Sequence, residues 1–130
     1  MQNDTISDML TRIRNANTLQ KKTVLIPWTK MNEGIVKVFV KEGFILDVQR
    51  EEETNTILVT LKYHKKTQKS SITNLQRISK PGLRLYSKAK DMPNVLGGMG
   101  VLVVSTSKGI LTDREAKQNQ LGGELLCSIW

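Results

Sequence analysis

The stretch FILDVQREEETNTILVTLKY, residues 44–63, decides the fold of the first half of the chain. Two runs rich in aliphatic and β-branched residues flank a polar turn at residues 51–55, which predicts two strands joined as a hairpin. In the second run Ile57, Val59 and Leu61 fall on every second position, as expected for a strand that buries one face. The stretch therefore predicts two adjacent strands in the middle of the chain.

The residues before this stretch predict two helices and a further strand. One apolar stripe with helical spacing, which Asp4 or Thr5 can cap, consists of Ile6, Met9, Leu10, Ile13 and Ala16. The β-branched run at residues 23–27 ends in proline and predicts a strand. Thr29 is the expected N-cap of a second helix that ends at Gly43 and buries Met31, Ile35, Val36, Phe39 and Val40. The first half therefore reads α-β-α-β-β.

The second half is predicted to be mainly β. Strands are expected at residues 71–78, 83–87, 101–105 and 124–130, the first two joined by turn chemistry at residues 80–82. Residues 112–115, Thr-Asp-Arg-Glu, form a capping box that opens one short helix. We therefore expect an α+β fold of two small lobes: an α-β-α-β-β lobe at residues 1–64, a polar and basic linker at 65–71, and a mainly β lobe with one short helix at 72–130.

The net charge of the chain limits which classes of binding partner are expected. The 130 residues carry 20 Lys and Arg against 12 Asp and Glu, which gives a net charge of +8 and a pI of about 9.8. Residues 1–65 contribute +2 and residues 66–130 contribute +6, so most of the excess lies in the second lobe. A small, folded, basic chain favours a polyanion, nucleic acid first and an anionic membrane second. No apolar run approaches the roughly 20 residues of a membrane span, and the first residues hold acids where a targeting peptide would hold bases.

Enzyme motifs are weak in this sequence. Ser105 and Lys108 have the S-x-x-K spacing of a serine nucleophile, but that chemistry needs a helix, and here a strand runs into a turn. A single cysteine, Cys127, and a single histidine, His64, exclude an internal disulfide, a multi-cysteine zinc site and a two-histidine metal site. A nucleic-acid-processing enzyme, with an acidic run only at residues 51–53, stays as the alternative, and a DNA-binding repressor is a third. We expect no cofactor, no metal and no small-molecule substrate.

Basic residues cluster in the second lobe around an aromatic ring. Five of them fall within fourteen residues: Arg77, Lys80, Arg84, Lys88 and Lys90. Lysine and arginine neutralise phosphates, and Tyr86 among them offers a ring on which an unstacked base can lie. An ordinary solvated face would show the same run of charges.

A hydroxyl-rich bend follows at residues 105–109, Ser-Thr-Ser-Lys-Gly. Its three adjacent hydroxyls can donate and accept hydrogen bonds, so they can contact base edges or ribose 2′-hydroxyls. Gly109 permits close backbone approach, and the helix that starts at Thr112 presents free amide groups to a phosphate. A plain turn before a capped helix is the structural alternative.

Six motifs together resemble the bacterial-type family of small-subunit ribosomal protein eight. They are DMLTRIRN at residues 8–15, EGFI at 42–45, RISKPGLRLY at 77–86, VVSTSKG at 103–109, TDR at 112–114 and LGGE at 121–124. The resemblance implies a non-catalytic structural protein of the small ribosomal subunit. Such a protein binds the central domain of 16S-type ribosomal RNA, supports subunit assembly, and has small-subunit ribosomal proteins as neighbours.

The resemblance also implies which residues bind RNA. The second lobe would bind an irregular internal loop of an RNA stem through residues 105–108, with Tyr86 and Glu124 nearby. The first lobe would make auxiliary backbone contacts through Thr5, Arg12, Arg14 and Lys30. Together with the residues singled out above, the expected set in the second lobe is Arg84, Tyr86, Lys88, Ser105, Thr106, Ser107, Lys108, Gly109, Thr112, Arg114 and Glu124.

The last residues bear on the compartment. The chain closes on Ile-Trp, which is similar to plastid members of the family. Plastid-encoded members need no transit peptide, in keeping with the acidic first residues. We therefore expect a location on chloroplast ribosomes, with the bacterial cytoplasm as the alternative.

Overall fold

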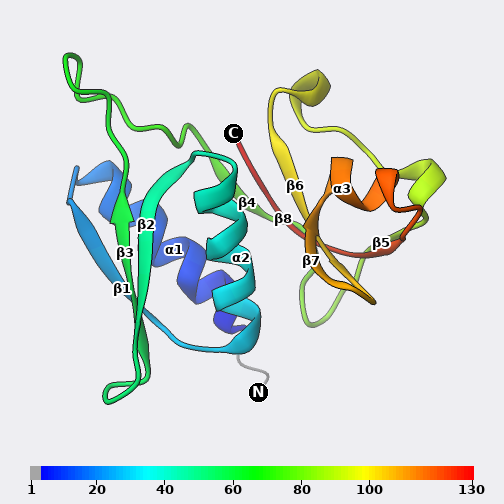
Figure 1. Ribbon diagram of the computed structural model, residues 1–130, viewed down its shortest axis with the longest axis horizontal. Helices are drawn as coiled ribbons and strands as arrows, with labels where there is room; N and C mark the ends of the chain where they lie inside the picture. The colour runs from blue at the N-terminus through cyan, green and yellow to red at the C-terminus, as the bar shows by residue number, and fades with distance from the viewer. Residues whose placement is uncertain (1–3) are drawn as a thin grey trace. The chain divides into compact units, whose positions relative to one another are not determined.

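The computed structural model describes residues 4–130 and divides the chain into two compact units (Figure 1). The first unit comprises Thr5–Asn74, and the second comprises Leu75–Trp130 together with Asp4. Each unit combines helix with antiparallel strands, so the predicted α+β class is confirmed. None of the helices within residues 4–130 is long and apolar enough to cross a membrane.

The first unit has the predicted order α-β-α-β-β. Its elements are α1 (Thr5–Thr18), β1 (Thr23–Pro27), α2 (Lys30–Lys41), β2 (Ile45–Glu51) and β3 (Thr56–Leu61). The sheet has the order β1-β3-β2 with both pairs antiparallel. Both helices pack against the same face of this sheet (Figure 1). Because β3 is central, β1 and β2 are the two edges.

Local capping signals set the bounds of α2. The side chain of Thr29 accepts a hydrogen bond from the amide of Asn32 at 2.9 Å, which confirms the predicted N-cap. The helix ends before Gly43, whose φ of +83° is a conformation that glycine adopts without strain. The predicted face was only partly right: Ile35, Val36 and Phe39 are buried, but Met31 and Val40 are only half-buried. Val38, which was not predicted, is buried.

A small polar network ties α2 to the residues before and beside it. The indole Nε1 of Trp28 donates to Glu33 Oε2, and Lys37 Nζ lies 2.9 Å from Glu33 Oε1. The guanidinium of Arg50 lies 3.9 Å above the centre of the Trp28 ring. The hydrogen bond from Trp28, and after it the one from Lys37, lowers the pKa of Glu33 below its usual value.

Replacing Trp28 with phenylalanine is expected to raise the pKa of Glu33 toward its ordinary value of about 4.3. Phenylalanine keeps a ring beneath Arg50 but removes the indole donor to the carboxylate. A depressed carboxyl pKa stabilises the folded state above the unfolded-state pKa, and this contribution is lost as pH falls through the folded-state pKa. Carboxyl NMR titration of both proteins measures the change. A Lys37→Gln control should raise the pKa less, and an unchanged value in Trp28→Phe would contradict the assignment.

The second unit is mainly β, as predicted. Its elements are β4 (Leu75–Arg77), β5 (Tyr86–Ser87), the 3-10 turns η1 (Ala89–Asp91) and η2 (Leu96–Gly98), β6 (Val101–Thr106), β7 (Gly109–Thr112), α3 (Asp113–Gln118) and β8 (Gly123–Ile129). The sheet has the order β4-β8-β6-β7, and β5 also pairs with β8. The core beside α3 consists of Met92, Leu102, Val104, Ala116 and Leu125.

Two predicted strands of this half are much shorter than expected. The strand expected at 71–78 forms only at Leu75–Arg77. The backbone of Ile72 is hydrogen-bonded to side chains instead of to another strand: its amide donates to Ser70 Oγ, and its carbonyl accepts from Asn17 Nδ2. The strand expected at 83–87 forms only at Tyr86–Ser87. The two 3-10 turns were not predicted.

Cys127 lies in β8 and is fully buried. Burial raises the pKa of its thiol to about 12, so the unreactive thiol form persists at neutral pH. Cys127 therefore serves as a small buried apolar side chain in the core.

Candidate nucleic-acid interface

A row of side chains crosses the sheet of the second unit. Ser105 of β6 lies opposite Glu124 of β8, and Glu124 lies opposite Tyr86 of β5. Directly opposed residues of antiparallel strands place their side chains on the same face. The sheet therefore brings together three candidates that are 19 and 38 residues apart in sequence. Tyr86 is 69% exposed, so its ring is open to a stacking partner.

The hydroxyl-rich bend forms the tip of the hairpin between β6 and β7. Thr106 builds this tip: its hydroxyl donates to the carbonyl of Gly109 at 2.8 Å and accepts from the amide of Lys108 at 3.2 Å. Gly109 has a φ of +110°, which favours glycine. Ser107, Lys108 and Gly109 are exposed, and the hydroxyl of Ser107 has no hydrogen-bond partner within residues 4–130. One hydroxyl thus shapes the bend while the next is presented outward.

The carboxylate of Glu124 is held from two sides. The buried hydroxyl of Ser79 donates to Oε2 at 2.6 Å, and Arg84 Nη1 lies 3.1 Å from the same oxygen. Ser79 Oγ also accepts from the amide of Leu85 at 3.0 Å, which fixes the approach to β5. The candidate Arg84 is therefore ion-paired and not a lone cation. Ser79, which sequence reasoning missed, positions Glu124, and no local signal in the sequence distinguishes it from a surface serine.

The residues at the start of α3 mainly cap the helix and offer few groups to a ligand. Thr112 accepts from the amide of Glu115 at 3.1 Å, and the Glu115 side chain accepts from the amide of Thr112 at 3.2 Å, which confirms the predicted capping box. The Thr112 side chain is buried, so this candidate has no exposed hydroxyl to offer RNA. Arg114 is exposed, and it donates a hydrogen bond to the carbonyl of Gly98.

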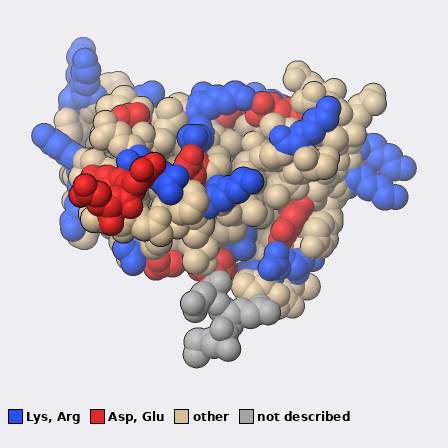
Figure 2. Space-filling model, turned by 60° about the horizontal axis from the view of Figure 1, so that its bottom comes forward, with Lys and Arg blue, Asp and Glu red and all other residues tan. Residues whose placement is uncertain are grey.

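Three lysines surround a hollow of about 390 Å³ in the second unit. Lys88 immediately precedes η1, Lys90 lies within it, and Lys117 comes from α3. Lys117 was not among the predicted residues, because only the tertiary fold brings α3 beside η1. Figure 2 shows that Lys and Arg side chains protrude in several separate groups on the face drawn. The lysine hollow is therefore one local concentration of positive charge among several.

The candidates of the first unit are all exposed, but they differ in their partners. Thr5 begins α1, Arg14 lies nine residues further along it, and Lys30 begins α2. Arg12 forms an ion pair with Asp8 at 3.1 Å, and its Nη1 reaches the carbonyl of Leu25 in β1 at 3.5 Å. Arg12 is thus directed along the edge of the sheet.

Comparison with known proteins shows the family of the chain. The family model described as Ribosomal protein S8 matches residues 4–130, which is nearly the whole chain. The chain belongs to the ribosomal protein S8 family.

Named relatives of this S8 chain come from algae, land plants and cyanobacteria. It is 57% identical over 136 residues to "Small ribosomal subunit protein uS8c" of Tetradesmus obliquus, with 100% of both chains covered. It is 54% identical over 132 residues to the uS8c protein of Marchantia polymorpha, again with 100% of both chains covered. It is 53% identical over 130 residues to "Small ribosomal subunit protein uS8" of Trichormus variabilis, with 98% of each chain covered.

Membership of the S8 family bears on the alternative of a nucleic-acid-processing enzyme. The acidic run at residues 51–53 lies at the turn between β2 and β3 and is exposed. Within residues 4–130 no group of three or more His, Cys, Asp or Glu side chains could hold a metal ion. Since the matching family is one of ribosomal proteins, nothing supports the enzyme alternative.

Proposed function

We propose that this chain is a structural constituent of the small ribosomal subunit of chloroplasts that binds the central domain of 16S-type ribosomal RNA. The small-subunit names of its relatives, including the uS8c proteins, support the ribosomal and chloroplast parts of this proposal. One observation carries the RNA-binding part: an exposed hydroxyl-rich bend lies beside the row of Ser105, Glu124 and Tyr86. Neighbouring small-subunit proteins are its other partners.

Each group at this surface has a distinct task. Ser107 contacts a base edge or a ribose 2′-hydroxyl, which duplex DNA lacks. Tyr86 stacks on an unpaired base, and Glu124 accepts from the amino group of another base. Lys108 contributes affinity through a phosphate. Because Arg84 neutralises Glu124, the carboxylate can approach bases without repelling the phosphates on either side.

Phosphate contacts elsewhere hold the RNA without reading its sequence. The lysines around the hollow beside η1 and α3, Lys88, Lys90 and Lys117, supply such contacts in the second unit. Thr5, Arg14 and Lys30 supply auxiliary contacts in the first unit. Because a ligand favours whichever state it binds better, binding stabilises the folded form of the RNA stem during subunit assembly. No reaction is catalysed.

Exchanging the two exposed side chains of the bend separates recognition from general affinity. Ser107→Ala is expected to reduce the preference for a central-domain stem over a scrambled stem about tenfold, or about 1.4 kcal/mol, because one hydrogen bond to the RNA is lost. Lys108→Ala should weaken binding to both RNAs and reduce the salt slope by about 0.9, since one phosphate contact is lost. Titrations of the purified full chain at several salt concentrations measure both quantities.

Matched controls come from residues 62–74, the part of the first unit that follows β3. Ser71→Ala and Lys65→Ala remove the same groups far from the bend in sequence, and neither should change the preference between the two RNAs. An unchanged preference in Ser107→Ala would show that residues 105–109 do not recognise the RNA. Cleavage of the RNA in the same mixtures with magnesium would overturn the non-catalytic role.

A further inference from the structure

The strand β1 is an open edge of the sheet in the first unit. The amide of Leu61 donates to the carbonyl of Lys22, and the amide of Trp28 donates to the carbonyl of Asn55. These two pairs fix the alternation of an antiparallel ladder, so the even-numbered residues of β1 bond to β3. Thr23 and Leu25 therefore turn their amide and carbonyl groups away from β3, toward the free edge.

Part of this edge is already closed by the chain itself. Pro27 has no amide hydrogen, and its carbonyl accepts from Asn32 Nδ2 at 3.1 Å. Arg12 reaches the carbonyl of Leu25 at 3.5 Å, the upper limit for a hydrogen bond. Within residues 4–130, the amide and carbonyl of Thr23 and the amide of Leu25 have no hydrogen-bond partner. Two residues of the edge, Thr23 and Leu25, are thus open to another strand.

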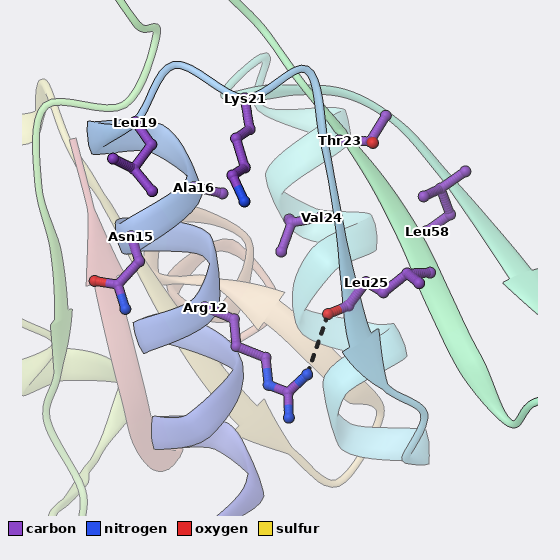
Figure 3. Close-up of a pocket in the computed structure, with 9 residues that line it drawn as sticks. All are labelled: Arg12, Asn15, Ala16, Leu19, Lys21, Thr23, Val24, Leu25 and Leu58. Carbon is purple, nitrogen blue, oxygen red and sulfur yellow. Dashed lines mark hydrogen bonds between the residues drawn. The ribbon is translucent and has the colours of Figure 1, made fainter.

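A groove of about 460 Å³ runs along this open edge, between β1 and α1 (Figure 3). Arg12 extends into it from α1, Lys21 extends into it from the connection between the two elements, and Asn15 of α1 also lines it. The hydroxyl of Tyr63 donates to the carbonyl of Lys21 at 2.6 Å, which holds this connection in place. The charged side chains that line the groove, Arg12 and Lys21, are both positive.

The rim of the groove is apolar. Leu19 at the end of α1 is 67% exposed, and Leu25 in β1 is 47% exposed. Side chains of this size at an unpaired edge are suited to contact apolar side chains of a ligand rather than water. The groove therefore combines unpaired backbone groups, an apolar rim and positive charge.

We propose that the edge of β1 binds an extended segment of another protein as an added strand, and that this segment carries alternating apolar and acidic side chains. Its backbone pairs with Thr23 and Leu25, and its apolar side chains pack on Leu19 and Leu25. An acidic side chain of the segment accepts a charge-assisted hydrogen bond from Arg12 or Lys21. The long contact from Arg12 to the carbonyl of Leu25 then gives way, which frees that carbonyl for an amide of the segment.

An RNA strand fits this groove less well than a peptide does. Phosphates could contact Arg12 and Lys21, but Asp8 lies 3.1 Å from Arg12 Nε and opposes a phosphate at that end. The sugar-phosphate backbone has no regular series of donors and acceptors to match the edge of a strand. This inference concerns a surface separate from the proposed RNA-binding bend and does not depend on it.

A synthetic, end-capped octapeptide of alternating Glu and Val tests the proposal on the purified full chain. We expect saturable binding that shifts the backbone amide signals of Thr23 and Leu25. Thr23→Pro removes the outward amide without touching the bonds to β3, and it should weaken binding about tenfold relative to Thr23→Val, which keeps that amide. The same peptide N-methylated at alternate residues should also bind about tenfold more weakly, and this arm needs no variant.

Other outcomes overturn the proposal. They are no binding of the Glu-Val peptide, equal affinity of Thr23→Pro and Thr23→Val, equal affinity of the N-methylated peptide, or equal affinity of a Lys-Val peptide. Displacement of the Glu-Val peptide by a single-stranded RNA octamer would identify RNA as the occupant and would also overturn it. Because the peptide arms contain no ribosomal RNA, their failure leaves the proposed ribosomal function untouched.

Discussion

Replacing Gly123 with alanine is expected to lower the free energy of unfolding by about 3 kcal/mol, the upper end for overpacking substitutions. Gly123 begins β8, and a Cβ there would overlap the carbonyl oxygen of Ser105 in β6. The obstacle is backbone, so no side-chain rotation relieves it, and one of the two strands must move. Urea unfolding followed by circular dichroism measures the loss.

Gly82 provides the matched control in the same unit. A Cβ at Gly82 would have no neighbour within 4 Å, and its φ is not positive. Gly82→Ala should therefore change the free energy of unfolding by no more than about 0.5 kcal/mol. Equal losses in the two variants would mean that the close approach of β8 to β6 does not constrain Gly123.

The same substitution connects the fold to the proposed interface. Ser105 and Glu124 face each other immediately beside Gly123, so a displaced β8 separates the row of Ser105, Glu124 and Tyr86. A Gly123→Ala variant that still folds should bind a central-domain RNA stem more weakly than the unsubstituted chain, although none of the side chains proposed to contact RNA is altered. A Cβ at Gly122 would likewise lie 2.6 Å from the carbonyl oxygen of Ser87. The two glycines therefore support the interface indirectly, because they allow neighbouring backbone segments to approach closely.

Sequence patterns predicted the features that depend on near neighbours. The alternation of Ile57, Val59 and Leu61 predicted β3 because period-two burial is a property of one strand. The capping box at Thr112 and Glu115 and the N-cap at Thr29 were predicted because each cap uses residues three positions apart. The bend predicted at residues 105–109 also depends on near neighbours, since the Thr106 hydroxyl bonds to the backbone of Lys108 and Gly109.

The features that the sequence did not predict depend on contacts between distant residues. The glycines at 122–123 appeared in the sequence only as part of the motif LGGE, whereas the structure uses both positions for close backbone approach. Arg84 and Lys88 were indistinguishable as cations, yet among residues 4–130 only Arg84 of these two finds a carboxylate, 40 residues away. The expected strand at 71–78 was shortened because Asn17, from α1, takes the carbonyl of Ile72. Propensity cannot anticipate a partner supplied by another element.

Arg77→Ala is expected to lower the free energy of unfolding by about 3 kcal/mol, because it breaks an ion pair that is largely out of water. Arg77 Nε lies 3.3 Å from Asp4 Oδ2, and Nη1 donates to the carbonyl of Leu126 in β8 at 2.7 Å. The Arg77 side chain is only 11% exposed. Its removal leaves a half-buried carboxylate without this cation and a strand carbonyl without this donor.

Arg84→Ala is the control, because its ion pair has a similar distance to that of Arg77 but a more exposed arginine. Arg84 lies 3.1 Å from Glu124, at least as close as Arg77 is to Asp4, but the Arg84 side chain is 52% exposed. Water and salt already screen this pair, so its loss should cost less than about 1 kcal/mol. Raising the salt concentration from about 0.1 M to 1 M should change the loss of unfolding free energy more in Arg84→Ala than in Arg77→Ala. Urea unfolding at the two salt concentrations measures both losses. If the two substitutions cost the same at both salt concentrations, burial of the Asp4–Arg77 pair does not stabilise the second unit.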